Sequence, residues 1–364
     1  MKYSFNYKNE GEKYVSPTDY KEFINQLSKA KSKIDKHQKK WNQIKKIIHD
    51  YEYIYTSPNH KKNIGNKIPI SRSYFKMKEI SEDYNLFNEK KNLRIYCMAE
   101  APGGFIECIL ENKNIIKELN ATTLYSINKD IPEWSSKIKR NDFINFCWGI
   151  RKDGNLYNIK NILSLIQTIQ KGRIDIITGD GGLDTSNDYN NQEKNSLELI
   201  YSEIFLALNL QKEGGVFICK VFDIFLKETI KLLYILSISY EKIYLHKPKF
   251  SRLSNSEKYI ICIGYKGYNK EIINKLFHSF HDKNVNIQVC ETFLKELTIY
   301  NKLYIDIQIE QIKKGIELIY KFKNNKQLNI NPTSLQINKA IEWCNKYNIQ
   351  INKKCYPLQN TFIK

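Results

Sequence analysis

Four charged residues that lie far apart in the sequence could carry proton chemistry: Lys76, Asp180, Lys220 and Glu257. Lys220 is the most informative, because it interrupts the apolar run "GGVFICKVF", where a buried charge is costly unless it is paired. Asp180 follows the run "IDIITG", and a carboxylate at the carboxyl end of such a strand faces the ligand crevice of an open α/β sheet. An amine held among carboxylates can accept or steer a proton from a weakly acidic hydroxyl.

Each of these residues also has a plain structural explanation. Lys76 lies in the amphipathic segment "SRSYFKMKEI", where a lysine is usually a solvated surface charge. Lys220 could stand at a strand end and extend its amine to water, and Glu257 could be an ordinary charge beside a strand. Residue types alone therefore do not separate a catalytic group from four unrelated charges.

A glycine turn lies between the first two of these residues. The stretch "YCMAEAPGGFIECIL" is typical of a strand end, a sharp turn and the start of a helix. Its glycines, Gly103 and Gly104, allow backbone amides to approach an anionic group, and a helix that begins near Phe105 adds its positive end. A simple structural turn is the alternative.

The elements that must position these residues alternate between strands and helices. Apolar runs that predict strands lie at 93–99, 122–127, 144–148, 174–180 and 214–222. A helical pattern at 192–213, which Gly214 and Gly215 would end, separates the fourth run from the fifth. Two further runs, 242–250 and 258–267, are joined by a short polar segment that suits an antiparallel pair. The order predicts an α/β fold with a mostly parallel, seven-stranded sheet, the arrangement of class I methyltransferases.

Segments on either side of this core are basic and helical. Residues 1–70 predict a basic helical extension, 71–267 the main domain and 268–364 a helical appendage of undetermined role. The formal charge of +19 suggests a polyanionic partner, although a lysine-rich composition also follows from an AT-rich genome. For the extension, contact with RNA and a solvated outer face remain equal alternatives.

Composition also limits the cellular setting. The eight cysteines form no CxxC pair and mostly lie in apolar runs, so we expect reduced thiols, no zinc and an intracellular site. The polar start and the absence of eighteen consecutive apolar residues predict a soluble protein without a membrane partner.

Taken together, these motifs resemble the FtsJ-like RNA ribose 2′-O-methyltransferases. The order Lys76, Asp180, Lys220, Glu257 is similar to the family's catalytic tetrad, "APGGF" to its cofactor turn and "GDGG" to its fourth-strand motif. The resemblance covers about 71–267 and implies a methyltransferase that uses S-adenosylmethionine and needs no metal. It also implies cofactor contacts from the turn and its neighbours: Glu100, Ala101, Pro102, Gly103, Gly104 and Phe105.

The resemblance is closest to the cap-specific mRNA enzymes, including those of large cytoplasmic DNA viruses, for which the cytoplasm of an infected cell or the virion is the expected location. Gly181 and Gly182 stand where ribosomal RNA enzymes usually carry Met and Ala. A ribosomal or transfer RNA enzyme, and a non-catalytic RNA-binding subunit of a capping or polymerase complex, remain the alternatives. Capping or transcription proteins are possible partners besides RNA.

The sequence also departs from the family pattern. Cys97 stands where many relatives have an acid, so the nearest carboxylate is that of Glu100. Asn128 or Asp130 would bind the cofactor's ribose, and Asp153 its adenine.

RNA contacts are expected from one loop, which precedes the last strand. Its candidates are Lys247, Lys249, Ser251 and Arg252, which could meet phosphates. The residues of a methylguanosine pocket cannot be chosen from the sequence.

Overall fold

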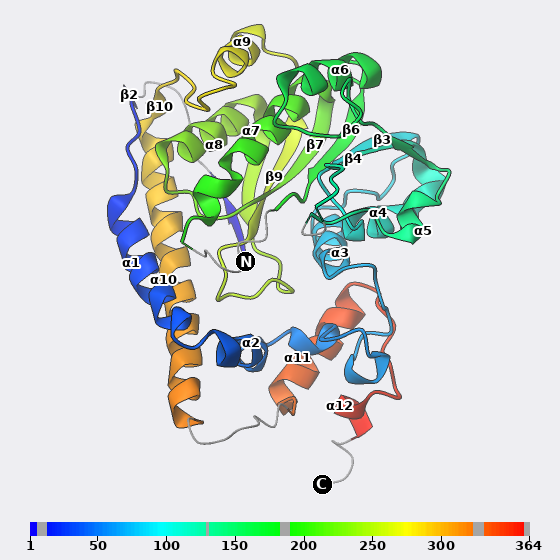
Figure 1. The fold of residues 1–364 in the computed structure, drawn as a ribbon, viewed down its shortest axis with the longest axis vertical. Coiled ribbons are helices and arrows are strands. Elements are labelled where there is room, and N and C mark those ends of the chain that lie inside the picture. Colours follow the sequence, from blue (N-terminus) through cyan, green and yellow to red (C-terminus); the bar gives the residue numbers. More distant parts are fainter. Residues whose placement is uncertain (6–12, 129–130, 183–189, 323–330, 360–364) are drawn as a thin grey trace.

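The chain folds around one twisted sheet, which carries helices on both faces (Figure 1). The computed structural model describes residues 1–5, 13–128, 131–182, 190–322 and 331–359. Within these residues the sheet has eight strands in the order β1-β8-β9-β7-β6-β3-β4-β5. Their bounds are β1 Lys2–Ser4, β3 Leu93–Met98, β4 Ile116–Thr122, β5 Ile144–Phe146, β6 Ile174–Gly179, β7 Gln211–Val221, β8 Tyr240–His246 and β9 Lys258–Tyr265.

The direction of the strands determines which strand ends lie side by side. Strands β5, β4, β3, β6 and β7 run parallel, whereas β9 is antiparallel to both β7 and β8. The carboxyl ends of the five parallel strands therefore lie along one edge of the sheet, next to the start of β9. The predicted α/β fold and the antiparallel final pair are confirmed.

The predicted number of strands is wrong by one. The extra strand is β1, whose three residues pair with the edge of β8. The second predicted run is also displaced, because β4 ends at Thr122, where the prediction began.

Two apolar layers hold the helices on the sheet. One face is covered by α6 (Ile159–Ile169), α7 (Gln192–Leu210) and α8 (Lys227–Ser239), through residues such as Ile162, Ile204 and Leu233. The other face is covered by α3 (Ser73–Asp83) and α4 (Gly104–Ile109), through residues such as Phe75 and Ile106. Strands buried on both sides consist of continuous apolar runs, and for this reason the sequence predicts β6 and β7.

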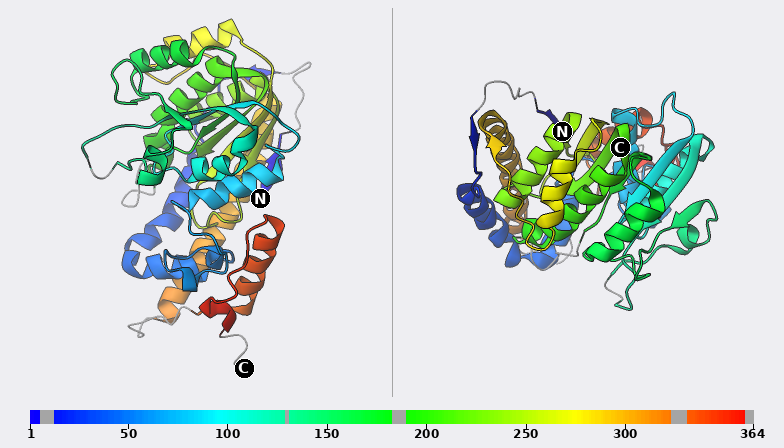
Figure 2. Two further views of the ribbon diagram at one scale, coloured as in Figure 1. Left: turned by 90° about the vertical axis from the view of Figure 1, so that its right-hand side faces the viewer. Right: turned by 90° about the horizontal axis from the view of Figure 1, so that it is seen from above.

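The two ends of the chain pack against each other below the sheet (Figures 1 and 2). Helices α1 (Lys21–Asp35) and α2 (Gln38–Ile47) share a buried cluster with the 31-residue α10 (Glu291–Lys321). Helix α11 (Ser334–Lys346) joins them, since the Gln336 side chain donates to the carbonyls of Ile47 and His49 at the end of α2. These ends are not independent tails.

The remaining elements are short. They are β2 Tyr14–Val15, β10 Val289–Cys290, α5 Ser136–Lys139, α9 Lys270–His278, α12 Tyr356–Gln359 and the 3₁₀ turns η1 Glu52–Ile54, η2 His60–Lys62 and η3 Leu110–Ile115. All eight cysteines are free. Among the described helices, none combines the length and apolar character that crossing a bilayer requires.

Candidate active site

The four charged residues meet as two ion pairs at the carboxyl edge of the sheet. Lys76 Nζ lies 2.7 Å from one carboxylate oxygen of Glu257 and donates to the other at 2.8 Å. Lys220 Nζ donates to the backbone carbonyl of Asp180 at 2.7 Å and lies 3.4 Å from its carboxylate. All four side chains are at most 16% exposed, so these charges are held mostly out of water.

Topology accounts for this meeting. Asp180 follows β6 and Lys220 is the next-to-last residue of β7, and these parallel neighbours end at the same edge. Glu257 directly precedes β9, which pairs with β7 so that Lys220 faces Tyr259. Lys76 reaches the group from α3.

The charges in this group shift one another's proton affinity. Burial alone would raise the pKa of Glu257, but the ammonium groups of Lys76 and Lys220 lower it to about 2. Burial acts to lower the pKa of Lys220, yet the carboxylates of Asp180, Glu257 and Glu203 together raise it above its ordinary value. The nearby carboxylates therefore outweigh burial, which by itself would lower the pKa of Lys220.

Two residues at this site carry no signal in the sequence. The fully buried Tyr259 donates its hydroxyl to the Asp180 carboxylate at 2.8 Å. Glu203 on α7 lies beneath the strand ends, where its carboxylate contacts Cys219, and burial raises the pKa of Glu203 to about 8. Both lie in apolar patterns and look like ordinary core positions.

A cavity of about 470 Å³ opens beside Lys220 and Asp180. Besides these two residues, its lining comes from the segments that follow β3, β4, β5 and β6, and from the start of α3: Ser71, Arg72, Ser73, Ala99, Ala101, Pro102, Thr123, Leu124, Ile131, Pro132, Gly154, Asn155, Leu156, Tyr157, Gly182 and Leu199. Pockets for small ligands and cofactors usually measure ~300–1,000 Å³. The size and the position at the strand ends fit a nucleoside cofactor.

Gly182 keeps the amine of Lys220 accessible from this cavity. A Cβ at residue 182 would lie 2.8 Å from Lys220 Nζ. A side chain there would have to displace the amine or cover it.

The glycine turn supports the cavity less directly than its sequence suggests. Ala101 and Pro102 line the cavity, whereas Gly103, Gly104 and Phe105 do not. Gly103 is required by its φ of 112°, which L side chains rarely adopt, and a Cβ on Gly104 would collide with Ser71 and Ser73 at 2.2 Å. Phe105 is buried and stacks on Tyr259. These three residues therefore shape the turn from behind.

The acidic cofactor candidates also lie behind the cavity wall. Glu100 is buried, accepts a hydrogen bond from Thr178, and has its pKa raised well above the ordinary value by burial. Asp153 accepts from Asn161 and from the backbone of Asn155, so it supports the lining segment and does not face the cavity. Asn128 is exposed and does not line the cavity, and Asp130 lies outside the described residues.

The loop from 247 to 257 gives its four RNA candidates different surroundings. Lys247 is 1% exposed and donates to Asn255 and to the Glu257 carbonyl, so we no longer assign it to RNA. Ser251 is buried and donates to the Glu257 carboxylate, so it supports the group of four charges and does not face solvent. Arg252 forms a bidentate pair with Glu52, whereas Lys249 is exposed.

Comparison with known proteins identifies a family that shares most of this domain. Residues 69–265 match the family model described as FtsJ-like methyltransferase. The chain is 29% identical over 238 residues to the cap-specific mRNA (nucleoside-2′-O-)-methyltransferase 1A of Caenorhabditis briggsae, covering 58% of this chain and 27% of that relative. It is 33% identical over 140 residues to the enzyme named cap-specific mRNA (nucleoside-2′-O-)-methyltransferase 1 of Trypanosoma brucei brucei, 38% of each chain. A further C. briggsae relative, 28% identical over 236 residues, which are 58% of this chain and 28% of that relative, is named an inactive form, 1B. The chain thus spans well under half the length of these relatives.

Proposed function

The chain belongs to the family of FtsJ-like methyltransferases, and from this premise we propose that it transfers a methyl group from S-adenosylmethionine to a ribose 2′-hydroxyl of RNA, near the 5′ cap of mRNA. The observation that carries the proposal is the pair of ion pairs beside the cavity, Lys76 with Glu257 and Lys220 with Asp180. The cap preference is supported by the relatives, which are named as cap-specific mRNA methyltransferases.

S-adenosylmethionine supplies an electrophilic methyl group on a sulfonium, so the protein must supply alignment and a route for the hydroxyl proton. Ala101, Pro102, Leu124 and Leu156 are the residues of the cavity that would hold the cofactor. Lys220 is the group that faces both the cavity and Asp180, and it is the candidate to contact the 2′-oxygen.

The role of Lys220 follows from its charge. With its pKa raised, the amine is an ammonium at neutral pH, so it orients the 2′-oxygen by donating a hydrogen bond and stabilises negative charge that develops there. Only the small neutral fraction accepts the proton, and this fraction grows with pH. A placed base contributes about 10²–10⁴-fold, so alignment of the reacting groups must supply much of the rest.

The test is methyl transfer from labelled cofactor to short capped RNA, followed by mapping of the product nucleotide. Lys220→Ala is expected to lose at least a thousandfold in turnover while cofactor affinity stays near that of the wild type. Lys212→Ala on the same strand is the matched control, because its side chain is 55% exposed and pairs with Asp175. A Lys220→Ala protein that turns over at the wild-type rate would remove Lys220 from this role.

Two alternatives are separated by the same assay. Equal transfer to capped and uncapped transcripts would favour a ribosomal or transfer RNA enzyme. Cofactor binding without transfer to any RNA would favour a non-catalytic subunit. One relative is itself named an inactive form. The paired, buried tetrad argues for catalysis, because two buried lysines are retained against their desolvation cost.

A further inference from the structure

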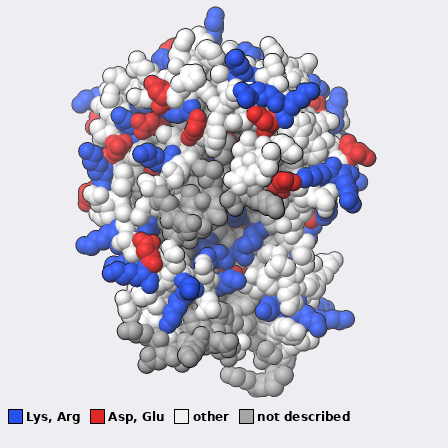
Figure 3. All heavy atoms as spheres, viewed as in Figure 1, with Lys and Arg blue, Asp and Glu red and all other residues white. Residues whose placement is uncertain are grey.

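A second cavity is larger than the one beside Lys220. Most of the residues that line it lie outside the matched family region. It measures about 900 Å³ and lies between the loop that follows β8 and the helices α2, α10 and α11. Lys45, Tyr51, Lys314, Lys321 and Lys339 line it from the chain ends, and Lys249 and Arg252 line it from the loop. In Figure 3 a hollow below the sheet shows mostly blue side chains on this face.

The charge of this lining is strongly unbalanced. Seven lysine and arginine side chains and the amino group of Met1 line it, against two carboxylates: Lys45, Lys247, Lys249, Arg252, Lys314, Lys321, Lys339, Asp50 and Glu317. Several of these cations are used elsewhere, since Lys339 pairs with Asp50 and Lys314 with Glu310. Within the described part of the chain, Lys45, Lys249 and Lys321 form no ion pair with a carboxylate, and the amine of Lys45 donates to the neutral side chain of Asn42.

Beside Arg252, which lines this cavity, several cations lie close to one buried acid. Arg252 and Arg72 share the single carboxylate of Glu52, which is 0% exposed. Burial, and then the charge of Arg252, lower the pKa of Lys45. Three cations around one buried acid leave an excess of positive charge that an anion would relieve.

Beside Arg252 the cavity also opens toward the catalytic group. A smaller cavity of about 180 Å³ is lined by Glu257 and Phe222, and it shares Lys45, Arg252 and Ser254 with the larger one. A chain whose ribose lies at Lys220 could therefore continue past Glu257 into the basic cavity. A small anion would use only one end of a space this large.

We propose that this cavity binds the phosphate backbone of single-stranded RNA, continuous with the strand whose ribose is methylated, through Lys45, Lys249 and Lys321. The inference rests on the proposed function for its choice of polyanion. It assigns to α2 and α10, which lie outside the matched family region, a direct part in holding the substrate.

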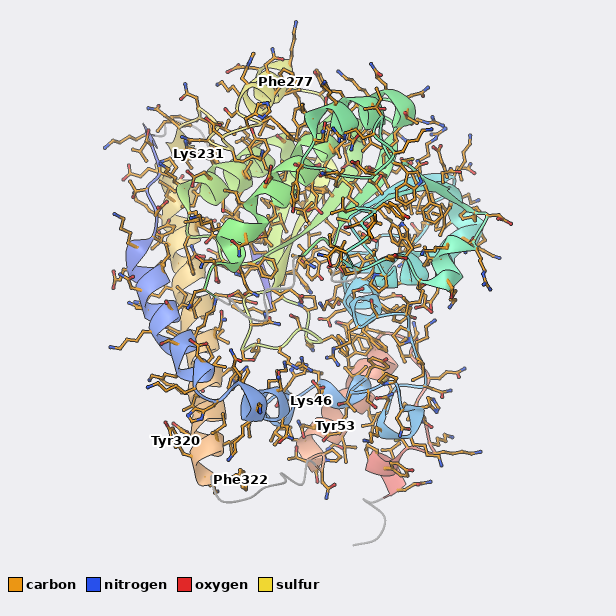
Figure 4. All side chains as sticks on the ribbon, viewed as in Figure 1. Lys46, Tyr53, Lys231, Phe277, Tyr320 and Phe322 are labelled. Atoms are coloured by element: carbon orange, nitrogen blue, oxygen red, sulfur yellow. The ribbon has the colours of Figure 1, made fainter. Side chains whose placement is uncertain are left out.

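The test is RNA affinity without cofactor, measured by fluorescence anisotropy of a short, unstructured, capped single strand at several salt concentrations. The test variant is Lys45→Gln with Lys249→Gln and Lys321→Gln. The control removes the same charge at Lys117, Lys160 and Lys270, three exposed lysines on β4, α6 and α9. Figure 4 shows Phe277 of α9 near the top of the view and Lys46 of α2 in its lower half.

Counterion release sets the expected size. Each lost phosphate contact reduces the salt slope for single strands by about 0.7, so three contacts reduce it by about 2 and weaken binding about a hundredfold at 0.1 M salt. The control variant shares the net charge and is expected to stay within about threefold of the wild type. Equal melting temperatures of the two variants show that both are folded.

Failure of this inference differs from failure of the proposed function. If the wild type methylates RNA but the test variant binds RNA with the affinity and salt slope of the control, the cavity is not the RNA site. If the wild type transfers no methyl group to any RNA while the two variants still differ as expected, the cavity binds RNA and the proposed function is wrong.

Discussion

The carboxylate of Glu257 pairs with Lys76 and also raises the pKa of Lys220, so Glu257→Gln tests the electrostatics of the site. The pKa of Glu257 falls from its ordinary 4.5 to about 2 in spite of burial. At 1.36 kcal/mol per pKa unit, the ammonium groups favour the carboxylate by at least ~3 kcal/mol. The interaction is mutual, so the carboxylate of Glu257 contributes, after that of Asp180, to raising the pKa of Lys220.

Removing this charge should therefore make Lys220 easier to deprotonate. Asp180 and Glu203 stay beside the amine in this variant, so the pKa of Lys220 falls only in part. We expect the methyl-transfer rate of the wild type to rise with pH into the alkaline range. We expect the rise in Glu257→Gln to come at a lower pH than in the wild type, with a lower plateau because Lys76 has lost the partner that aligns it.

The assay is single-turnover transfer to saturating capped RNA between about pH 6 and pH 10.5, a range that extends to the ordinary lysine pKa, so that chemistry and not product release is observed. Ser251→Ala is the matched control, because Ser251 donates a hydrogen bond to the same carboxylate at 2.9 Å but carries no charge. Its rate is expected to rise over the same pH range as that of the wild type. An unshifted rise in Glu257→Gln would refute the view that carboxylates raise the pKa of Lys220.

Three further substitutions test supporting residues. Tyr259→Phe removes the hydroxyl that donates to Asp180, and it is expected to lower the single-turnover rate about tenfold or more while calorimetry finds unchanged cofactor affinity. Gly103→Ala is expected to destabilise the fold by roughly 2–3 kcal/mol in urea titrations, because φ is 112° and the new Cβ would lie 2.6 Å from the nearest side-chain carbon. Lys247→Met leaves three partly buried acceptors without their donor, and urea titration should show a loss of about 3 kcal/mol, whereas an RNA contact would cost affinity and not stability.

Much of the fold could be predicted from the sequence because its central strands are buried on both faces. The runs at β6 and β7 consist almost entirely of apolar residues, and their positions were predicted within a few residues. Strand β4 was displaced because its first half, "IKEL", carries two charges and lacks a continuous run. Strand β1 was missed because three residues form a strand only through their pairing with β8.

Only the site residues at strand ends could be brought together from the sequence. Asp180 and Lys220 end neighbouring parallel strands, so topology brings them together. The loop from 247 to 257 follows no period, and three nearby cations in it have three environments: Lys247 is buried, Lys249 is exposed and Arg252 is paired with Glu52. Nothing in the order of residues distinguishes these environments, since each depends on a partner supplied by distant sequence.

Residues from the two ends of the chain hold the loop that positions Glu257. The loop that carries Glu257 is held by Gln308 of α10, which donates to the Ser254 carbonyl, and by Lys31 of α1, which donates to Ser256. Glu52 fixes Arg252 in the same loop. A catalytic carboxylate must be held within a fraction of an ångström to align an amine, and a loop without regular hydrogen bonding cannot hold it alone. The segments outside the matched family region therefore help to position Glu257 in the candidate active site.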